Sequence, residues 1–336
     1  MAVLVSGASG FIGSHTCVEL LNVGEDVIGF DNFYNSKDDI PKKIEKLTGK
    51  SLKFYKADMC VKADIHKIFT ENEIDSVIHF AGYKAVGESV AKPLMYYGNN
   101  IDGTVVLLEA MKEFGCDRFV FSSSATVYKF PAVSPAIKED FELTATNHPY
   151  GTTKMIIENI CRDVSISDDK FACALLRYFN PVGAHDSGVI GENPNGIPNN
   201  LMPIVLKAVT GQLPSMTVFG NDYPTPDGTC IRDYLHVVDL AKAHVAALNK
   251  VREEGFSGCA EYNLGTGKGT SVLELLTAFE KVNGLKIPYI IGKRRPGDAA
   301  EYYAVPEKAE QELGWRAELN IEDMCKSAYD FAVKNA

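Results

Sequence analysis

The sequence predicts an α/β protein with a doubly wound parallel sheet and a smaller, interleaved C-terminal α/β domain. Three observations predict this fold. Short apolar segments alternate with helical patterns through the first half of the 336-residue chain, a glycine triplet follows the first apolar segment, and an aspartate follows the second. Continuous apolar strands separated by helices indicate a parallel sheet that is covered on both faces. Right-handed crossovers make such a sheet doubly wound.

The elements of the first half follow in order. The apolar segments predict strands at residues 2–5, 26–30, 52–55, 77–79, 118–123 and 171–177. Apolar residues at helical spacing predict helices at residues 11–23, about 63–70, about 93–114 and about 150–165.

After residue 180 this rhythm breaks. Residues 181–200 are rich in proline and glycine and poor in apolar residues, which is typical of a functional loop. The pattern then predicts a helix at 201–210, strands at 216–219 and 231–236, and a helix at 237–251. We therefore expect a cofactor domain at residues 1–180 and a substrate domain at 181–336, interleaved with each other.

Charge and cysteine usage exclude several classes of partner. The net charge is −10, from 34 Lys and Arg against 44 Asp and Glu, and this disfavours binding to nucleic acid or anionic membranes. The eight cysteines form neither a C-x-x-C motif nor a metal-type cluster with histidine, so no metal is expected. Buried thiols in a reducing cytosol are the simpler interpretation. The N-terminal residues do not resemble a signal peptide and no segment is long and apolar enough to span a bilayer, so we expect a cytoplasmic protein.

The glycine triplet Gly7, Gly10 and Gly13 has the spacing G-x-x-G-x-x-G and lies between the first predicted strand and helix. Glycines there allow the backbone to approach a pyrophosphate, and the helix N-terminus attracts its charge. Asp31 follows the second predicted strand, where a carboxylate binds a ribose diol and repels a 2′-phosphate. This pattern indicates a Rossmann-type site for NAD rather than NADP. A plain tight turn and a helix N-cap at Asp31 are the alternatives.

Tyr150 and Lys154 form a Y-x-x-x-K pair, which places both side chains on one face of a helix. Tyrosine has a pKa of about 10 in water, too high for a base at neutral pH. A lysine one turn away favours the phenolate and makes the tyrosine a candidate base. A solvated helix face is the alternative for this spacing alone.

Hydroxyl and guanidinium groups complete the candidate site. Ser122–Tyr128 lies at the carboxyl end of the fifth predicted strand, and we choose Ser124 from its three serines as the group that binds a reacting alkoxide. Arg232 and Arg295 lie near turns in an acidic chain, which suggests a diphosphate pocket. Serines that only end a strand and arginines that only aid solubility are the alternatives.

The chain resembles the UDP-glucose 4-epimerases of the extended short-chain dehydrogenase/reductase superfamily nearly end to end. The resemblance rests on GASGFIGSHT, VIHFAGYKAVGESVAKPLMYY, FSSSATVY, LLRYFNPVGAH, GIPNNLMP, VFGNDYPTPDGTCIRDYLHV and YNLGTG. It implies that tightly held NAD oxidises carbon 4 of UDP-galactose or UDP-glucose to a keto sugar. The keto sugar then rotates and is reduced on its other face. Tyr150 is then the base, Lys154 lowers its pKa, and Ser124 binds the same oxygen.

The resemblance also implies two sets of binding residues. Besides the glycines and the three catalytic residues, the cofactor set contains Phe11, Ile12, Asp31, Asn32, Asn35, Ser36, Asp58, Met59, Phe80, Ala81, Gly82, Lys84, Asn99 and Phe179. Besides Ser124 and Tyr150, the UDP-sugar set contains Asn180, Asn200, Leu201, Thr217, Val218, Phe219, Arg232, Arg295, Asp298 and Tyr302. Tyr302 resembles the position that walls the sugar pocket, and its bulk predicts that N-acetylated sugars are excluded.

The resemblance further implies a homodimer formed by the helices at 93–114 and 150–165. Val105, Leu108 and Ile157 could face a partner, although packing in the core explains them equally well. The sequence departs from the family pattern at Lys129 and over residues 130–145, outside the predicted chemistry.

Two other activities compete with the epimerase hypothesis. A nucleotide-sugar dehydratase or decarboxylase needs carboxylates where this chain has Ala125 and Thr126. A non-catalytic NAD sensor or scaffold would not need the pair Tyr150 and Lys154.

Overall fold

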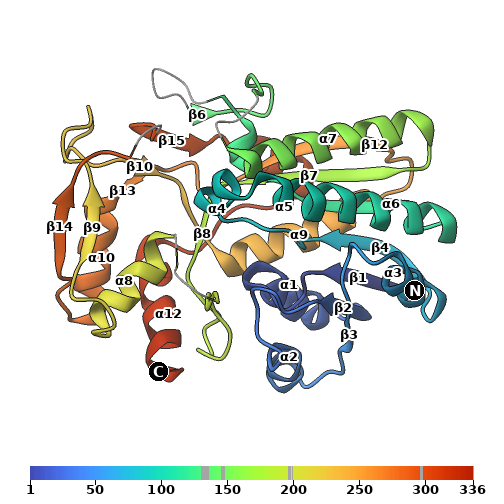
Figure 1. The fold of residues 1–336 in the computed structure, drawn as a ribbon, viewed down its shortest axis with the longest axis horizontal. Helices are drawn as coiled ribbons and strands as arrows, with labels where there is room; N and C mark the ends of the chain where they lie inside the picture. Colours follow the sequence, from blue (N-terminus) through green and yellow to red (C-terminus); the bar gives the residue numbers. More distant parts are fainter. Residues whose placement is uncertain (130–135, 145–147, 196–197, 199, 296–297, 336) are drawn as a thin grey trace.

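Seven parallel strands form the central sheet of the computed structural model, which describes residues 1–129, 136–144, 148–195, 198, 200–295 and 298–335 (Figure 1). Six residues of the divergent segment 130–145, namely 130–135, and also residue 145, lie outside this description. The strands are β1 Ala2–Ser6, β2 Val27–Asp31, β3 Lys53–Lys56, β4 Ile74–His79, β5 Arg118–Ser122, β7 Ala172–Tyr178 and β12 Gly258–Leu264.

The strand order is β12-β7-β5-β4-β1-β2-β3, which confirms the predicted doubly wound fold. The chain runs outward from β1 to β3 and then returns to the other side of β1 to form β4. The connections after β1 and β4 therefore lead to opposite sides of the sheet. Such a switch point opens a crevice at the carboxyl ends of the strands, where open α/β sheets bind ligands.

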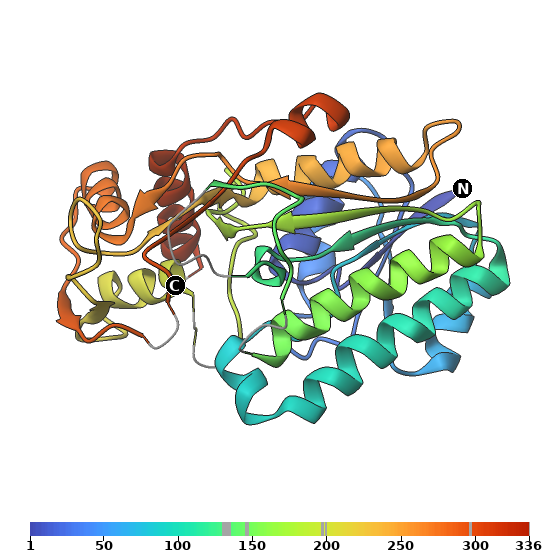
Figure 2. The same ribbon diagram turned by 90° about the horizontal axis from the view of Figure 1, so that it is seen from above.

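Helices cover both faces of this sheet, because successive residues of a strand point to opposite faces and apolar side chains occur on both. In β1, Val3 and Val5 pack in one core and Ala2 and Leu4 in the other. One face carries α3 Lys62–Thr70, α6 Gly103–Phe114 and α7 Pro149–Ser167, with α6 and α7 side by side in Figure 2. The other face carries α1 Phe11–Asn22, α2 Ile40–Thr48, α9 Val237–Val251 and, beyond α9, α11 Glu307–Leu313.

The helix expected at 93–114 is interrupted. It consists of α5 Pro93–Tyr97, a π-helical turn at Gly98–Asp102, and α6, and it is preceded by α4 Val86–Ala91. The buried side chain of Asn100 in the wide turn accepts a hydrogen bond from the Tyr83 amide and donates to Tyr83 O and Thr153 Oγ1. The turn thus ties the loop after β4 to α7, and such π-turns are common at functional sites.

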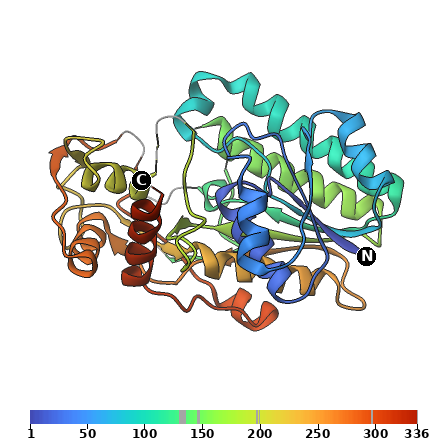
Figure 3. The same cartoon turned by 90° about the horizontal axis from the view of Figure 1, so that it is seen from below.

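The remaining elements form a second lobe, on the left of Figures 1 and 3. A four-stranded sheet has the order β13-β10-β15-β6. Two strand pairs lie beside it, β8 with β11 and β9 with β14. The strands are β6 Ala136–Ile137, β8 Asn180–Val182, β9 Met216–Phe219, β10 Ile231–Arg232, β11 Tyr234–His236, β13 Thr270–Ser271, β14 Tyr289–Gly292 and β15 Glu301–Ala304. The helices are α8 Leu201–Val209, α10 Val272–Asn283 and α12 Ile321–Lys334.

The single strand expected at 231–236 is therefore wrong, because β10 and β11 belong to different sheets. Asp233 separates them, and its buried carboxylate accepts hydrogen bonds from the amides of Thr266, Gly267 and Ala304. These bonds turn the chain from one sheet to the next. Further along, α9 and β12 return to the first lobe, so residues beyond 181 build both lobes.

All eight cysteines are free thiols, five of them buried. In the part of the chain that the structure describes, no helix combines the length and apolar character needed to cross a membrane.

Candidate active site

The turn between β1 and α1 brings the backbone close to the end of β4. Gly7 has a φ of +66°, and a Cβ atom there would lie 2.8 Å from the Ala81 amide nitrogen. A Cβ atom on Gly13 would lie 2.2 Å from the Gly7 carbonyl oxygen. Gly10 precedes α1 without a side-chain cap, so the helix presents open amides at its N-terminus. The Ser9 hydroxyl in this turn is buried and has no hydrogen-bond partner among the described residues. This cradle fits a dinucleotide pyrophosphate.

Asp31 ends β2 beside this turn. Its carboxylate accepts hydrogen bonds from Ser9 N, Phe33 N and Ser36 Oγ at 3.2, 2.7 and 2.9 Å. Burial raises the pKa of Asp31, and these bonds oppose the rise. The alternative of a helix N-cap is wrong, because α2 begins at Ile40. A hollow of about 280 Å³ is lined by Phe33, Ser36, Lys37, Asp38, Lys56 and Asn195, and Ser36 connects it to Asp31 through their hydrogen bond.

Most of the other residues predicted for the cofactor follow strands of the main sheet. Asn32 donates a 2.9 Å bond to Asp58 after β3, and Asn35 accepts one from Asn195 N. Met59 packs in the core against Gly103. After β4, the amides of Phe80 and Ala81 both donate to Ser6 Oγ. Gly82 and Lys84 lie in the same loop, Asn99 in the π-turn, Phe11 and Ile12 in the first turn of α1, and Phe179 after β7.

Lys84 connects this loop to the segment at 181–200. Its ammonium group donates to Glu192 Oε1 at 3.2 Å, and Asn200 Nδ2 donates to the same oxygen at 2.8 Å. The Glu192 side chain is 8% exposed. Sequence reasoning missed Glu192, because a single glutamate in a polar loop gives no signal. The expectation that 181–200 is more than a linker agrees with these contacts.

Tyr150, Lys154 and Ser124 meet at the carboxyl end of β5. His148 caps α7 by accepting from Gly151 N, which sets the first turn containing Tyr150. Lys154 lies one turn later, with its Nζ atom 6.0 Å from the centre of the Tyr150 ring and 2.6 Å from the Ser122 carbonyl oxygen. Ser124 follows β5, accepts from Thr126 N, and forms a hydrogen bond with Tyr150.

The electrostatics of this group follow from its burial. Desolvation raises the pKa of Tyr150, and the bond with Ser124 opposes that rise. Desolvation also lowers the pKa of Lys154 to about 7, against the opposing charge of Glu158. The phenol and the amine therefore both lose stabilisation of their charged forms when they are buried.

The residues predicted for UDP lie in the second lobe. Arg232 on β10 donates to Asp298 Oδ1 at 3.2 Å and stands in register with Tyr302 on β15. The Arg295 guanidinium lies 4.1 Å from the centre of the Phe219 ring on β9. Three distant segments thus place two arginines and an aromatic ring in one lobe. Asn180 begins β8, and Asn200 and Leu201 begin α8.

Burial and ion pairing limit what some residues of this region can contribute. The Val218 side chain is buried in the core, so only its backbone can face a ligand. Thr217 precedes it in β9 and is partly buried. Arg294 is bonded to Asp222 on the surface, and its guanidinium lies 4.2 Å from the centre of the Tyr223 ring.

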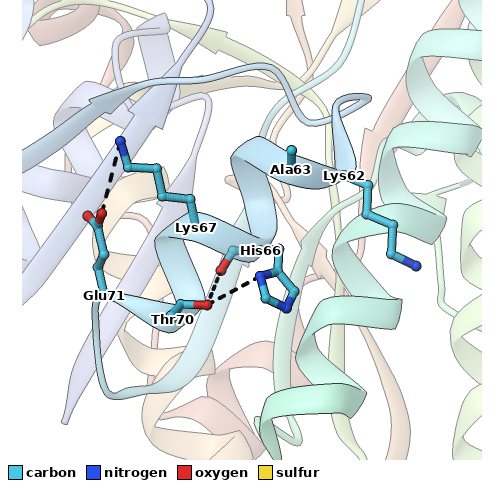
Figure 4. Close-up of a pocket in the computed structure, with 6 residues that line it drawn as sticks. All are labelled: Lys62, Ala63, His66, Lys67, Thr70 and Glu71. Carbon is cyan, nitrogen blue, oxygen red and sulfur yellow. Dashed lines mark hydrogen bonds and ion pairs between the residues drawn. The ribbon is translucent and has the colours of Figure 1, made fainter.

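A second hollow, of about 540 Å³, lies on α3 and is unrelated to this site (Figure 4). Its lining residues Lys67 and Glu71 pair with each other, and His66 lies beside Thr70. No group of His, Cys, Asp or Glu among the described residues has an arrangement that could hold a metal ion.

Comparison with known proteins gives a consistent result. The model of the NAD dependent epimerase/dehydratase family matches residues 3–265. The chain is 56% identical to UDP-glucose 4-epimerase of Bacillus subtilis, over 100% of this chain and 98% of the relative. The structure of UDP-glucose 4-epimerase from Bifidobacterium longum, in complex with NAD+ and UDP, is 52% identical with a TM-score of 0.95, covering 100% of this chain and 99% of that one. A structure of the enzyme from Stenotrophomonas maltophila, with bound NAD and formylated UDP-arabinopyranose, is 44% identical with a TM-score of 0.96, covering 100% and 98%.

Proposed function

Because the chain belongs to the UDP-glucose 4-epimerases of the NAD dependent epimerase/dehydratase family, we propose that it interconverts UDP-galactose and UDP-glucose by inverting carbon 4 of the hexose. The observation that carries this proposal is the meeting of Tyr150, Lys154 and Ser124 at the edge of the sheet that also holds the glycine turn. NAD, when bound at that turn, supplies reversible oxidation of the sugar at carbon 4.

The chain's own residues then move and hold the proton. Tyr150 takes the proton of the 4-hydroxyl group and, once the 4-keto sugar presents its other face, returns that proton to the same oxygen. The charge of Lys154 favours the phenolate, and Ser124 donates to the developing alkoxide. Lys154 remains in place because Ser122 O accepts its hydrogen bond. Burial keeps the three groups away from bulk water.

Binding of the nucleotide is separated from binding of the sugar. We assign the diphosphate to Arg232 and Arg295, whose guanidinium groups match phosphate oxygens, and the uridine end to Phe219 and the residues around it. Asp298 keeps Arg232 oriented through their hydrogen bond. Firm binding of the uridine and diphosphate allows the sugar itself to be held loosely, so that the sugar can rotate between the two half-reactions.

We also propose a homodimer that forms through the α4–α7 side of the molecule. Val90, Leu94 and Ile166 are 60, 84 and 84% exposed there, and Val105 is 36% exposed. Leu108 and Ile157 cannot contribute, because both are buried in the core beneath α6 and α7. Core packing, the other interpretation of these two residues, is therefore the correct one.

The activity is tested by incubating the purified protein with UDP-galactose without added NAD, quenching, and then measuring UDP-glucose. We expect conversion, and we expect Tyr150→Phe to lower kcat by about 10²–10⁴-fold through loss of the base. Tyr262→Phe is the matched control, since its hydroxyl bonds to Glu312 outside the site. Absence of conversion by the wild-type protein, even with NAD added, contradicts the proposal; normal turnover by Tyr150→Phe contradicts the assignment of the base.

A further inference from the structure

Glu158 is a fully buried carboxylate directly behind the catalytic group. Its oxygens accept hydrogen bonds from Ser123 Oγ at 2.6 Å, Arg177 Nε and Nη2 at 2.9 and 2.6 Å, and Arg162 Nη2 at 3.1 Å. The side chains of Glu158 and Arg177 are 0 and 1% exposed. A charge buried this deeply is costly unless every oxygen has a partner.

The position of Glu158 connects it with the reacting groups in two ways. On α7 it lies one turn after Lys154 and two turns after Tyr150, so the three side chains share a face of the helix. Through Ser123 it also holds the end of β5, between Ser122, which accepts from Lys154, and Ser124, which bonds to Tyr150.

We propose that Glu158 is a positioning residue for the reaction, which keeps the Lys154 ammonium group charged and holds the serine segment 122–124 against α7. The inference rests on the function proposed above. This role of Glu158 goes beyond neutralising the charge of Arg177. Arg177 needs a carboxylate nearby, but that carboxylate need not face the catalytic lysine.

The charged and titratable groups around this pair are few. Lys154 faces Tyr150 and Glu158 on α7 and His79 on β4. Tyr178 on β7 faces Tyr150, and its hydroxyl bonds to Ser122 Oγ. Burial lowers the pKa of His79 to about 3 and raises that of Tyr178, so neither changes charge near neutral pH. Glu158 is the only carboxylate that the structure shows acting on Lys154 among the described residues, and it raises the pKa of the amine.

Because Glu158 raises the pKa of Lys154, removing its charge should lower that pKa. Activity requires a charged Lys154, so the alkaline side of the kcat–pH profile reports the loss of its proton. Glu158→Gln keeps the shape of the side chain and removes its charge. We expect this variant to lose activity at a pH about one unit lower than the wild-type protein does. Glu158→Asp keeps the charge and should retain the wild-type midpoint, even where kcat is lower.

The matched control is Glu261→Gln. Glu261 on β12 also accepts from Arg162, at 2.7 Å, but it does not face Lys154. We expect its alkaline midpoint to coincide with that of the wild-type protein. An unchanged midpoint in a folded Glu158→Gln protein overturns the proposal, and so does an equal shift in Glu261→Gln.

A second measurement is independent of turnover. In holoenzyme labelled with 13Cε-lysine, NMR follows the Lys154 signal against pH, and Lys154→Met identifies that signal by its loss. Glu158→Gln should lower the Lys154 midpoint by about one unit. If Glu158→Gln fails to fold because Arg177 is left unpaired, the double variant Glu158→Gln, Arg177→Gln removes both charges and should show the same direction of shift.

These results separate the two proposals. A wild-type protein that does not convert UDP-galactose contradicts the proposed function, while the NMR titration still decides whether Glu158 sets the charge of Lys154. An active wild-type protein with superimposable profiles for Glu158→Gln contradicts only the role of Glu158.

Discussion

The ring of Tyr302 on β15 lies against the ring of Phe179, which follows β7, with their centres 4.9 Å apart. The Tyr302 hydroxyl also donates a hydrogen bond to the carbonyl oxygen of Ala125, the residue after Ser124. Tyr302 is buried, and it stands between the serine segment and a residue assigned to the cofactor. This side chain is held at both ends, and we propose that it forms the wall of the sugar pocket.

Tyr302→Ala should therefore enlarge the pocket. We expect the kcat/KM ratio of UDP-N-acetylglucosamine to UDP-glucose to rise by about tenfold or more, because removal of a steric wall admits the larger substituent. Tyr303→Ala is the control, since neighbouring side chains in a strand point to opposite faces. Comparable turnover of both sugars by the wild-type protein would show that Tyr302 excludes nothing.

Asp31 should determine the choice of dinucleotide. Asp31→Asn removes the charge that repels a 2′-phosphate and weakens the bonds from Ser9 and Ser36. We expect NADP, measured by mass spectrometry of extracted cofactor, to increase relative to NAD by about tenfold, the effect of one charge-assisted hydrogen bond. Asp39→Asn is the control, because that carboxylate is 54% exposed, pairs only with Lys43 among the described residues, and makes no cap hydrogen bond to α2. Equal cofactor content in both variants would contradict this role.

Buried histidines should make the protein sensitive to acid. Desolvation lowers the pKa of His15 and His79 to about 3 and of His236 and His244 to about 4. The unfolded chain binds protons at these histidines below about pH 6.5 while the folded protein does not, so stability falls as the pH drops through that value.

At pH 5 each of these histidines should cost about 2 kcal/mol of the free energy of unfolding. Together, the costs of the four histidines approach the whole free energy of unfolding of a typical domain. We expect urea midpoints, followed by circular dichroism, to fall steeply between pH 6.5 and 5. His244→Asn should flatten this slope, whereas His66→Asn, on the exposed face of α3, should not. A slope that is the same in both variants would contradict the assignment.

Local pattern was sufficient to predict much of this molecule. The six strands expected in the first half all form, within a few residues of the predicted ends, because each is a short apolar run next to turn residues. The approach of Tyr150 to Lys154 follows from helical spacing, and that of Ser124 follows from its place after β5. These relationships need only the period of one helix and the common edge of a parallel sheet.

Other features depend on partners distant in the sequence. The π-turn at 98–102 exists because Asn100 bonds to Tyr83 and Thr153, and the break at Asp233 depends on amides at 266, 267 and 304. The pairing of Glu158 with Arg177 joins a helix to a strand. No periodicity in the sequence predicts such contacts, because the fold alone brings these side chains together.

The contact of Glu192 with Lys84 and Asn200 leads to a prediction about cofactor retention. The Glu192 carboxylate connects the loop after β4 with the start of α8, and the Lys84 ammonium group lies 5.9 Å from the centre of the Phe11 ring in the first turn of α1. Glu192→Gln weakens this connection across the expected path of the dinucleotide. We expect bound NAD to be lost about tenfold faster, as for one charge-assisted hydrogen bond, with little change in kcat per bound NAD because no reacting group moves. Asp186→Asn is the matched control, since its carboxylate lies in the same segment but is 95% exposed. Repeated gel filtration followed by measurement of the remaining NAD tests the prediction. If Glu192→Gln retains NAD as well as Asp186→Asn does, the contact serves only to order the segment.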